Sequence, residues 1–235
     1  MQLGVRDVAK VLNVPERKIY RWIKERSLPA YRVGEQYRFN RAEVLEWATS
    51  RKIDVSVDLF AERDNHSHPA VGLADALDRG GIFYQINGSD KASVLRAVVE
   101  AMRLPEGVDR EFLFRVLLAR EALGSTGIGE GIAIPHPRNP IVLDVERPAI
   151  ALCFLTAPIE FGALDGEPVR ILFSLVSPTV REHLQLLSRL AFALRDPSFK
   201  AAVAREAARD EILKQARRID SGLAQPVAVQ ATGEG

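Results

Sequence analysis

Disulfide chemistry is absent from this sequence, because its 235 residues include a single cysteine, Cys153. A chain without disulfides fits a reducing compartment, so we expect a cytoplasmic protein. Long apolar runs are also missing: the longest candidates, such as residues 149–155, have the length of a strand rather than the roughly 20 residues that cross a bilayer. Charges interrupt the first 26 residues throughout. We therefore expect no secretory leader there and no membrane insertion.

Histidine is scarce too, with four residues in the chain. His66 and His68 form a His-x-His pair, but no cysteine or further histidine lies nearby in the sequence to complete a metal site. The segment around them, residues 53–71, is polar, contains Pro69 and shows no sustained period. It is typical of a solvated linker, and we expect neither a metal nor a cofactor in this protein.

The composition that remains is that of a globular protein with an uneven charge. Hydrophobic residues make up 47% of the chain and charged residues 27%, which excludes disorder over most of its length. Residues 1–52 hold 12 Lys plus Arg against 6 Asp plus Glu, whereas the rest of the chain holds 20 against 25. A basic module on a mildly acidic body indicates two domains, and a basic module favours polyanions such as nucleic acid. The alternative is a solvated surface that happens to be basic.

The N-terminal module has the spacing of two short helices followed by a hairpin. Apolar residues fall at helical spacing over residues 5–12, and Pro15 suits the first turn of a second helix that runs to about residue 25. Residues 30–39 alternate on both sides of a Gly-Glu pair, which predicts a hairpin. A third helix follows from about residue 41 and directs apolar side chains inward.

This order resembles the excisionase-like, MerR-type winged helix-turn-helix family over about residues 3–51. The residues that carry the likeness are 7–14, 20–23 and 39–44. The resemblance implies that the second helix enters the major groove of double-stranded DNA and that the hairpin contacts the backbone or the minor groove. The basic residues expected to face DNA are Arg17, Lys18, Arg21 and Lys24 in the second helix and Arg32 and Arg38 in the hairpin. The alternative is a helix-turn-helix used for protein contact, and tight specific DNA binding would call for a dimer or tandem sites.

From residue 72 the chain alternates helical and strand signals, which predicts an α/β domain with a mixed sheet flanked by helices. The expected helices cover 90–102, 109–123 and the chain from 182 onward, and the expected strands cover 81–86, 132–134, 150–156 and 171–177. A helix with a solvated amphipathic face is expected from 200 to about 219, after a restart at Asp196-Pro197. The tail from residue 221 to residue 235 is expected to be disordered.

One segment of this body suggests chemistry. A helix is expected to end at Gly124, a glycine-rich turn follows, and a short strand then leads to His136, which stands between Pro135 and Pro137. The turn lacks the Gly-Lys-Ser/Thr of a phosphate-binding loop and the Gly-x-Gly-x-x-Gly of a dinucleotide site. A neutral imidazole on a stiff backbone can attack phosphorus near pH 7. Arg120 and the backbone amides of the turn could neutralise the phosphoryl oxygens, although a lone strand histidine is by default a core residue.

The segment is similar to the active-site signature of enzyme IIA of the phosphoenolpyruvate phosphotransferase system, in its fructose/mannitol and nitrogen-regulatory class. Glu121, residues 128–129 and residues 132–136 fit that signature in order, and the likeness continues through 159–169 and 181–184 within about residues 70–220. It implies that His136 accepts a phosphoryl group from the phosphohistidine of an HPr-type carrier protein. It also implies that Arg120 stabilises the transferred group and that His183 lies close to His136 and supports or orients it.

Two residues of this segment need separate comment. Pro137 departs from the small residue that the family commonly places after the histidine, and the missing N–H could remove one phosphate donor. Glu121 is better explained as a structural ion-pair partner than as a catalytic group.

The domains expected are therefore a helix-turn-helix at 1–52, a linker at 53–71, an enzyme IIA domain at 72–220 and a tail. The expected function is that of a phosphotransferase: a regulatory phosphohistidine carrier of the nitrogen type that couples phosphate on His136 to DNA binding or transcription. Its partners would be the phospho-HPr-type carrier, double-stranded DNA and a regulatory target protein. The sequence also allows the chain to form an oligomer. The alternatives are a plain sugar-transport enzyme IIA and a DNA-binding module with a sensor domain that cannot be phosphorylated.

Overall fold

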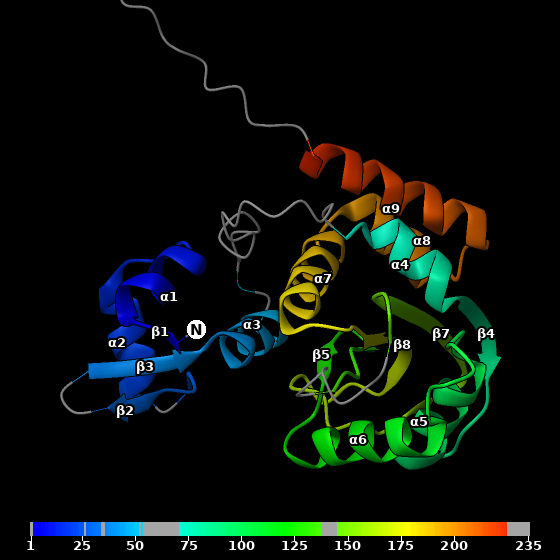
Figure 1. Cartoon of the computed structure of the whole chain (residues 1–235), viewed down its shortest axis with the longest axis horizontal. Coiled ribbons are helices and arrows are strands. Elements are labelled where there is room, and N and C mark those ends of the chain that lie inside the picture. Colours follow the sequence, from blue (N-terminus) through cyan, green and yellow to red (C-terminus); the bar gives the residue numbers. More distant parts are fainter. Residues whose placement is uncertain are drawn as a thin grey trace, which may run out of the picture.

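The computed structural model describes residues 2–25, 27–33, 36–51, 53, 71–137 and 145–224. The chain folds into a small N-terminal domain and a larger C-terminal domain that lie side by side (Figure 1). Nearly all of the expected linker, including His66 and His68, lies outside the described residues.

The small domain has the expected order of helix, turn, helix, hairpin and helix. Its elements are β1 (Gln2–Leu3), α1 (Val5–Val11), α2 (Glu16–Lys24), β2 (Tyr31–Val33), β3 (Gln36–Asn40) and α3 (Arg41–Ser50). Pro15 is the N-cap of α2 rather than its first residue. Strand β1, which the sequence did not predict, pairs with β3 in an antiparallel sheet of order β1-β3-β2. The helices pack on a core that includes the fully buried Val8, Ile19 and Leu45.

The larger domain is a mixed α/β fold, as predicted. Its elements are α4 (Leu73–Gly80), β4 (Ile82–Ile86), α5 (Lys91–Ala101), α6 (Arg110–Ala122), β5 (Gly127–Gly129), β6 (Ile132–Ala133), β7 (Ala149–Ile159), β8 (Val169–Val176), α7 (Val180–Ala193), α8 (Pro197–Ala204) and α9 (Arg209–Ala224). The strands form one sheet of order β4-β7-β8-β6-β5. The pairs β4–β7 and β6–β8 are parallel, and the pairs β7–β8 and β5–β6 are antiparallel.

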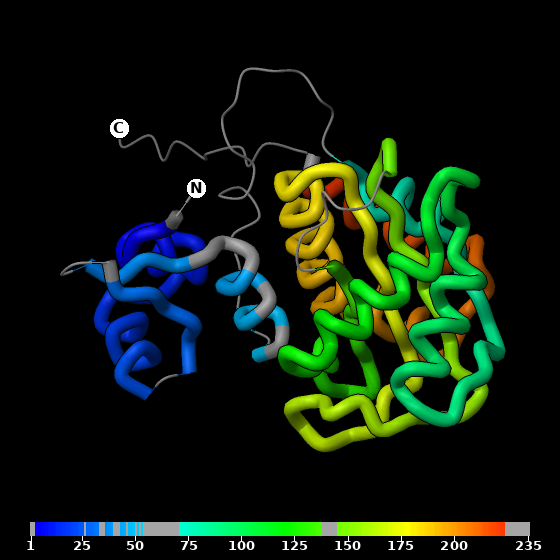
Figure 2. Tube along the Cα trace, turned by 60° about the horizontal axis from the view of Figure 1, so that its bottom comes forward, coloured from blue at the N-terminus to red at the C-terminus, as the bar shows by residue number. Residues whose placement is uncertain are grey.

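Helices cover both faces of this sheet. Helices α5 and α6 lie on one face, and α4, α7, α8 and α9 lie on the other (Figures 1 and 2). Strand β7 shows why: Leu152 and Phe154 pack in the cluster with α7, while Ala151, Cys153 and Leu155 pack in the cluster with α5 and α6. The apolar run at 149–155 is therefore a strand buried on both sides.

The C-terminal helices differ from the expectation in two ways. The helix expected from 200 to 219 is broken, because α8 ends at Ala204, Glu206 has a φ of 53° and α9 begins at Arg209. Helix α9 also continues beyond the expected end, although it is amphipathic as expected: Lys214 and Arg217 are exposed, and Ile212 and Ile219 on the other face are among the core residues. Helix α9 continues to Ala224, so the first residues of the expected tail are helical, and residues 225–235 lie outside the description.

Within the ranges that the structure describes, no helix is both long enough and apolar enough to cross a membrane.

Candidate functional site

His136 lies just beyond β6, the short strand that pairs with β8 near the middle of the sheet. Its side chain is buried, and its Nδ1 is 2.6 Å from the carbonyl oxygen of Ile134. A carbonyl oxygen only accepts hydrogen bonds, so Nδ1 carries the ring proton and donates it. The lone pair of the neutral imidazole is then on Nε2, which makes Nε2 the nucleophilic atom.

His183 lies in the first turn of α7, which Thr179 caps by accepting a hydrogen bond from the Glu182 amide. Its ring is buried and its centroid is 5.2 Å from that of His136, with 52° between the ring planes. The Nδ1 atom of His183 is 3.1 Å from the hydroxyl oxygen of Ser177. A hydroxyl that donates to Nδ1 leaves the proton of His183 on Nε2. In that tautomer the pair offers one nitrogen lone pair and one N–H donor in the same place.

Arg120 lies near the end of α6 and lines the same cavity as His136. Its Nη1 donates a hydrogen bond to the carbonyl oxygen of Gly124 at 2.8 Å, which holds the guanidinium near the end of the helix. The structure thus places the rings of His136 and His183 side by side and puts Arg120 on the wall of the cavity that His136 lines. A cation here is suited to an anionic substrate group.

Glu121 has the structural role that the sequence predicted for it. Its side chain is buried, its Oε1 is 3.2 Å from Lys91 Nζ, and it accepts hydrogen bonds from both the amide and the hydroxyl of Thr126. The carbonyl oxygen of Thr126 in turn accepts the amide of Ile134 at 3.0 Å. Glu121 therefore helps to position the strand that leads to His136.

The structure accounts for three of the backbone amides of the glycine-rich segment, which could have contributed to phosphate binding. The segment is a β5–β6 hairpin that turns at Glu130 and Gly131, both with a left-handed φ. The amides of Thr126, Gly127 and Glu130 donate to the side chains of Glu121, Ser125 and Asp165, respectively. These three donors are taken by side-chain acceptors of the protein, two of them carboxylates, and are not available to a phosphoryl group.

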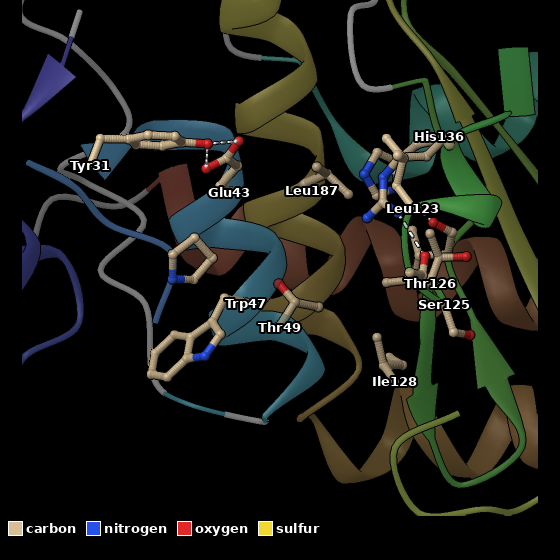
Figure 3. Close-up of a pocket in the computed structure, with 14 residues that line it drawn as sticks. Tyr31, Glu43, Trp47, Thr49, Leu123, Ser125, Thr126, Ile128, His136 and Leu187 are labelled. Atoms are coloured by element: carbon tan, nitrogen blue, oxygen red, sulfur yellow. Dashed lines mark hydrogen bonds between the residues drawn. The ribbon is translucent and has the colours of Figure 1, made fainter. Parts of the chain in front are cut away.

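A cavity of about 460 Å³ adjoins His136, and both domains line it (Figure 3). The larger domain contributes residues that include Arg120, Thr126, Ile128, His136 and Leu187. The small domain contributes Pro29, Tyr31, Glu43, Trp47 and Thr49, none of which sequence reasoning singled out as site residues. No motif marks them, because their place in the site depends on how the two domains pack.

The expected DNA-contacting residues are all in the small domain. Their exposure differs: Arg17, Arg21, Lys24 and Arg32 are exposed, whereas Lys18 and Arg38 are half-buried. Lys18 Nζ lies 5.1 Å from the ring centroid of Trp22, and Arg38 donates to the side chain of Gln36. Helix α2 lies on the side of the small domain away from α7 (Figures 1 and 2). Its basic face is therefore available to a long polyanion.

Comparison with known families divides the chain in the same way. Residues 75–217 match the family described as phosphoenolpyruvate-dependent sugar phosphotransferase system, EIIA 2, and residues 3–52 match a helix-turn-helix domain family. The nitrogen regulatory protein of Pseudomonas aeruginosa is 41% identical over 128 residues, which cover 53% of this chain and 80% of that protein. The nitrogen regulatory protein of Bradyrhizobium diazoefficiens is 37% identical over 161 residues, which cover 68% of this chain and 99% of that protein.

A solved structure agrees with these sequence relatives. The crystal structure of nitrogen regulatory protein IIA-Ntr from Neisseria meningitidis superposes with a TM-score of 0.54 at 28% identity, and the match covers 61% of this chain and 98% of that one. These similarities extend over the larger part of the chain but not over all of it.

Proposed function

Because this chain belongs to the EIIA type 2 family of the phosphoenolpyruvate-dependent sugar phosphotransferase system and carries a helix-turn-helix domain, we propose that it is a regulatory phosphocarrier. His136 accepts the phosphoryl group from the phosphohistidine of an HPr-type carrier protein. The observation that carries this proposal is the short contact between His136 Nδ1 and the Ile134 carbonyl oxygen, which leaves Nε2 as the nucleophile beside His183.

The transfer is a displacement at phosphorus between two imidazoles. The lone pair of His136 Nε2 attacks phosphorus, the P–N bond of the carrier breaks, and the carrier imidazole leaves with that electron pair. The proton of His136 stays on Nδ1, hydrogen-bonded to the Ile134 carbonyl oxygen, so the positive charge of the phosphorylated ring passes from the carrier to His136. Arg120 neutralises the phosphoryl oxygens, and the Nε2–H of His183 donates to one of them.

Two observations favour regulation over bulk sugar transport. The relatives just described are nitrogen regulatory proteins, and the helix-turn-helix domain has no evident place in the uptake of a sugar. The exposed basic residues of α2 support double-stranded DNA as the partner of this domain. We propose that phosphorylation of His136 is coupled to DNA binding or to contact with a regulatory target protein, through the charge that the phosphoryl group adds.

Phosphotransfer is tested by mixing the purified chain with phosphoenolpyruvate, enzyme I and HPr and measuring its intact mass. We expect an acid-labile phosphoryl increment on the wild type and none on His136→Ala. His183→Gln should still be phosphorylated, but more slowly, because it loses the ring that faces the acceptor. An increment on His136→Ala would assign the acceptor to another residue, and no increment on the wild type would refute the carrier function.

DNA binding is tested through its dependence on salt. Each phosphate contact should contribute a slope of about −0.9 to the plot of log affinity against log salt concentration. The variant Arg21→Glu should bind less tightly and with a smaller slope, whereas Arg115→Glu, the same change of charge at an exposed position of α6, should change neither. Affinity that does not depend on salt would contradict an electrostatic DNA contact by α2.

A further inference from the structure

The wall of the cavity that faces His136 is part of the helix-turn-helix domain. Tyr31 of β2 and Glu43, Trp47 and Thr49 of α3 line one side, while His136 lies across from them on the larger domain (Figure 3). Helix α3 lies between the rest of the small domain and α7 in both overall views (Figures 1 and 2). The side chain of His136 therefore faces α3 of the same chain across this cavity.

This docking of α3 extends beyond a single contact. Trp47 is buried and packs edge-on against Trp22 at 4.8 Å between ring centroids, which fixes α3 to the core of the small domain. A second cavity of about 240 Å³ lies between Thr49 and Ile53 on one side and residues of β5, α7 and α8 on the other. The small domain thus meets the larger one through α3, which contacts α7 and β5.

A protein that phosphorylates His136 needs the same face. Its phosphorus must come within about 3–3.5 Å of Nε2 for attack. A protein partner of standard size covers about 800 Å² around that point. Since Tyr31, Trp47 and Thr49 share a cavity with His136, they lie inside any such footprint.

We propose that the helix-turn-helix domain and the phosphoryl-donor protein compete for the surface around His136, so that the docked domain shields His136 and phosphorylated His136 releases the domain. This inference rests on the proposed function of His136 as a phosphoryl acceptor. It adds that, in the unphosphorylated protein, α3 and β2 of the same chain occupy the surface around His136 that the phosphoryl donor would contact.

The charges across the cavity give the release its direction. Both carboxylate oxygens of Glu43 lie 2.8 Å from the hydroxyl of Tyr31, so that carboxylate is held on the cavity wall. A phosphoryl group brings about two further negative charges into this space. Like charges then face each other across the interface, while Arg120 on the side of His136 is attracted to the phosphoryl group. Coupling of this kind is reciprocal: phosphorylation weakens docking to the extent that docking weakens phosphorylation.

The test is to fix the two domains together and follow phosphorylation. The double variant Ile53→Cys/Ala191→Cys places two thiols on the second cavity, which His136 does not line. A short bis-maleimide then links them. The native Cys153 does not interfere, because it is buried and burial raises the pKa of its thiol to about 12. Each single variant, treated with the same reagent, is the matched control.

We expect the unphosphorylated double variant to cross-link and the linked protein to accept phosphate from HPr at least about tenfold more slowly than the treated single variants. Prior phosphorylation should lower the yield of cross-link, and Glu43→Gln, which keeps an acceptor for Tyr31, should weaken that effect.

Failure of this inference is distinct from failure of the proposed function. No cross-link in the unphosphorylated protein, or equal rates for the linked and unlinked proteins, would overturn the competition and leave the carrier function in place. Absence of phosphate on the unlinked protein would overturn the carrier function and the competition with it.

Discussion

Replacing Glu121 by alanine should destabilise the larger domain strongly, although Glu121 has no direct part in the phosphotransfer that we propose. The variant removes the acceptor for the amide and the hydroxyl of Thr126, a residue that is only 6% exposed. A buried donor left without its partner costs about 1–3 kcal/mol. Lys91 also loses its ion pair, but its side chain is 31% exposed, so water replaces much of that contact. We therefore expect Glu121→Ala to lower the free energy of unfolding by about 3–5 kcal/mol.

The matched control is Glu121→Gln, which keeps one oxygen for Thr126 but loses the negative charge and the second acceptor oxygen. We expect it to cost about 1–2 kcal/mol, since one acceptor and the pairing with Lys91 are lost. Urea denaturation followed by far-UV circular dichroism measures both variants. Tryptophan fluorescence separates the domains, because both tryptophans of the chain, Trp22 and Trp47, lie in the small domain.

The same substitution should also affect the position of His136, the acceptor that we propose. Thr126 holds the amide of Ile134, whose own carbonyl oxygen holds His136, so Glu121→Ala should also slow phosphorylation in the remaining folded protein. A loss of less than about 1 kcal/mol in Glu121→Ala would refute the reasoning, because it would mean that water reaches the Thr126 donors.

Three further predictions concern the scaffold. Burial raises the pKa of the Cys153 thiol to about 12, so Cys153 should react with maleimide at pH 8 only after the protein unfolds. Rapid labelling of the native protein, detected by its intact mass, would contradict this burial. Asp196→Ala should cost about 1 kcal/mol because the carboxylate caps α8. Hydrogen bonding, first from the Phe199 amide, lowers the pKa of Asp196 in the folded state. The stability that the Asp196 carboxylate contributes is therefore fully present above the ordinary carboxyl pKa and is lost as the pH falls through the folded pKa. The difference in melting temperature between the wild type and Asp196→Ala should accordingly become smaller in acid. Gly80→Ala should cost about 1–3 kcal/mol or more in a urea titration, since the added carbon would overlap the backbone of Ile150; an unchanged midpoint would show that α4 can move away from β7.

Several elements followed from local chemistry that the sequence displays. Helix α5 begins after Asp90 and α6 after Asp109, because each carboxylate accepts a backbone amide of its own first turn. The hairpin in the small domain and the buried strand β7 followed from alternation and from an apolar run. These signals act within a few residues, so they can be read without knowing the rest of the fold.

Other features were missed because packing decides them. The break between α8 and α9 lies in an alanine-rich stretch with good helical propensity, and α9 turns back so that Ile212 and Ile219 reach the core. The backbone amides of the glycine-rich segment could have met a phosphoryl group, but the acceptors Glu121 and Asp165 take the amides of Thr126 and Glu130.

The sequence by itself determined the two domains, the histidine with two prolines beside it and the cation one turn away from the end of its helix. Only the tertiary structure decided which nitrogen of His136 carries the ring proton, which hydroxyl lies beside His183, and that α3 lines the cavity next to His136. The physical reason is range: caps, turns and periodicity depend on neighbours in the chain, whereas a site made from two domains depends on which surfaces bury each other, and no local pattern records that choice.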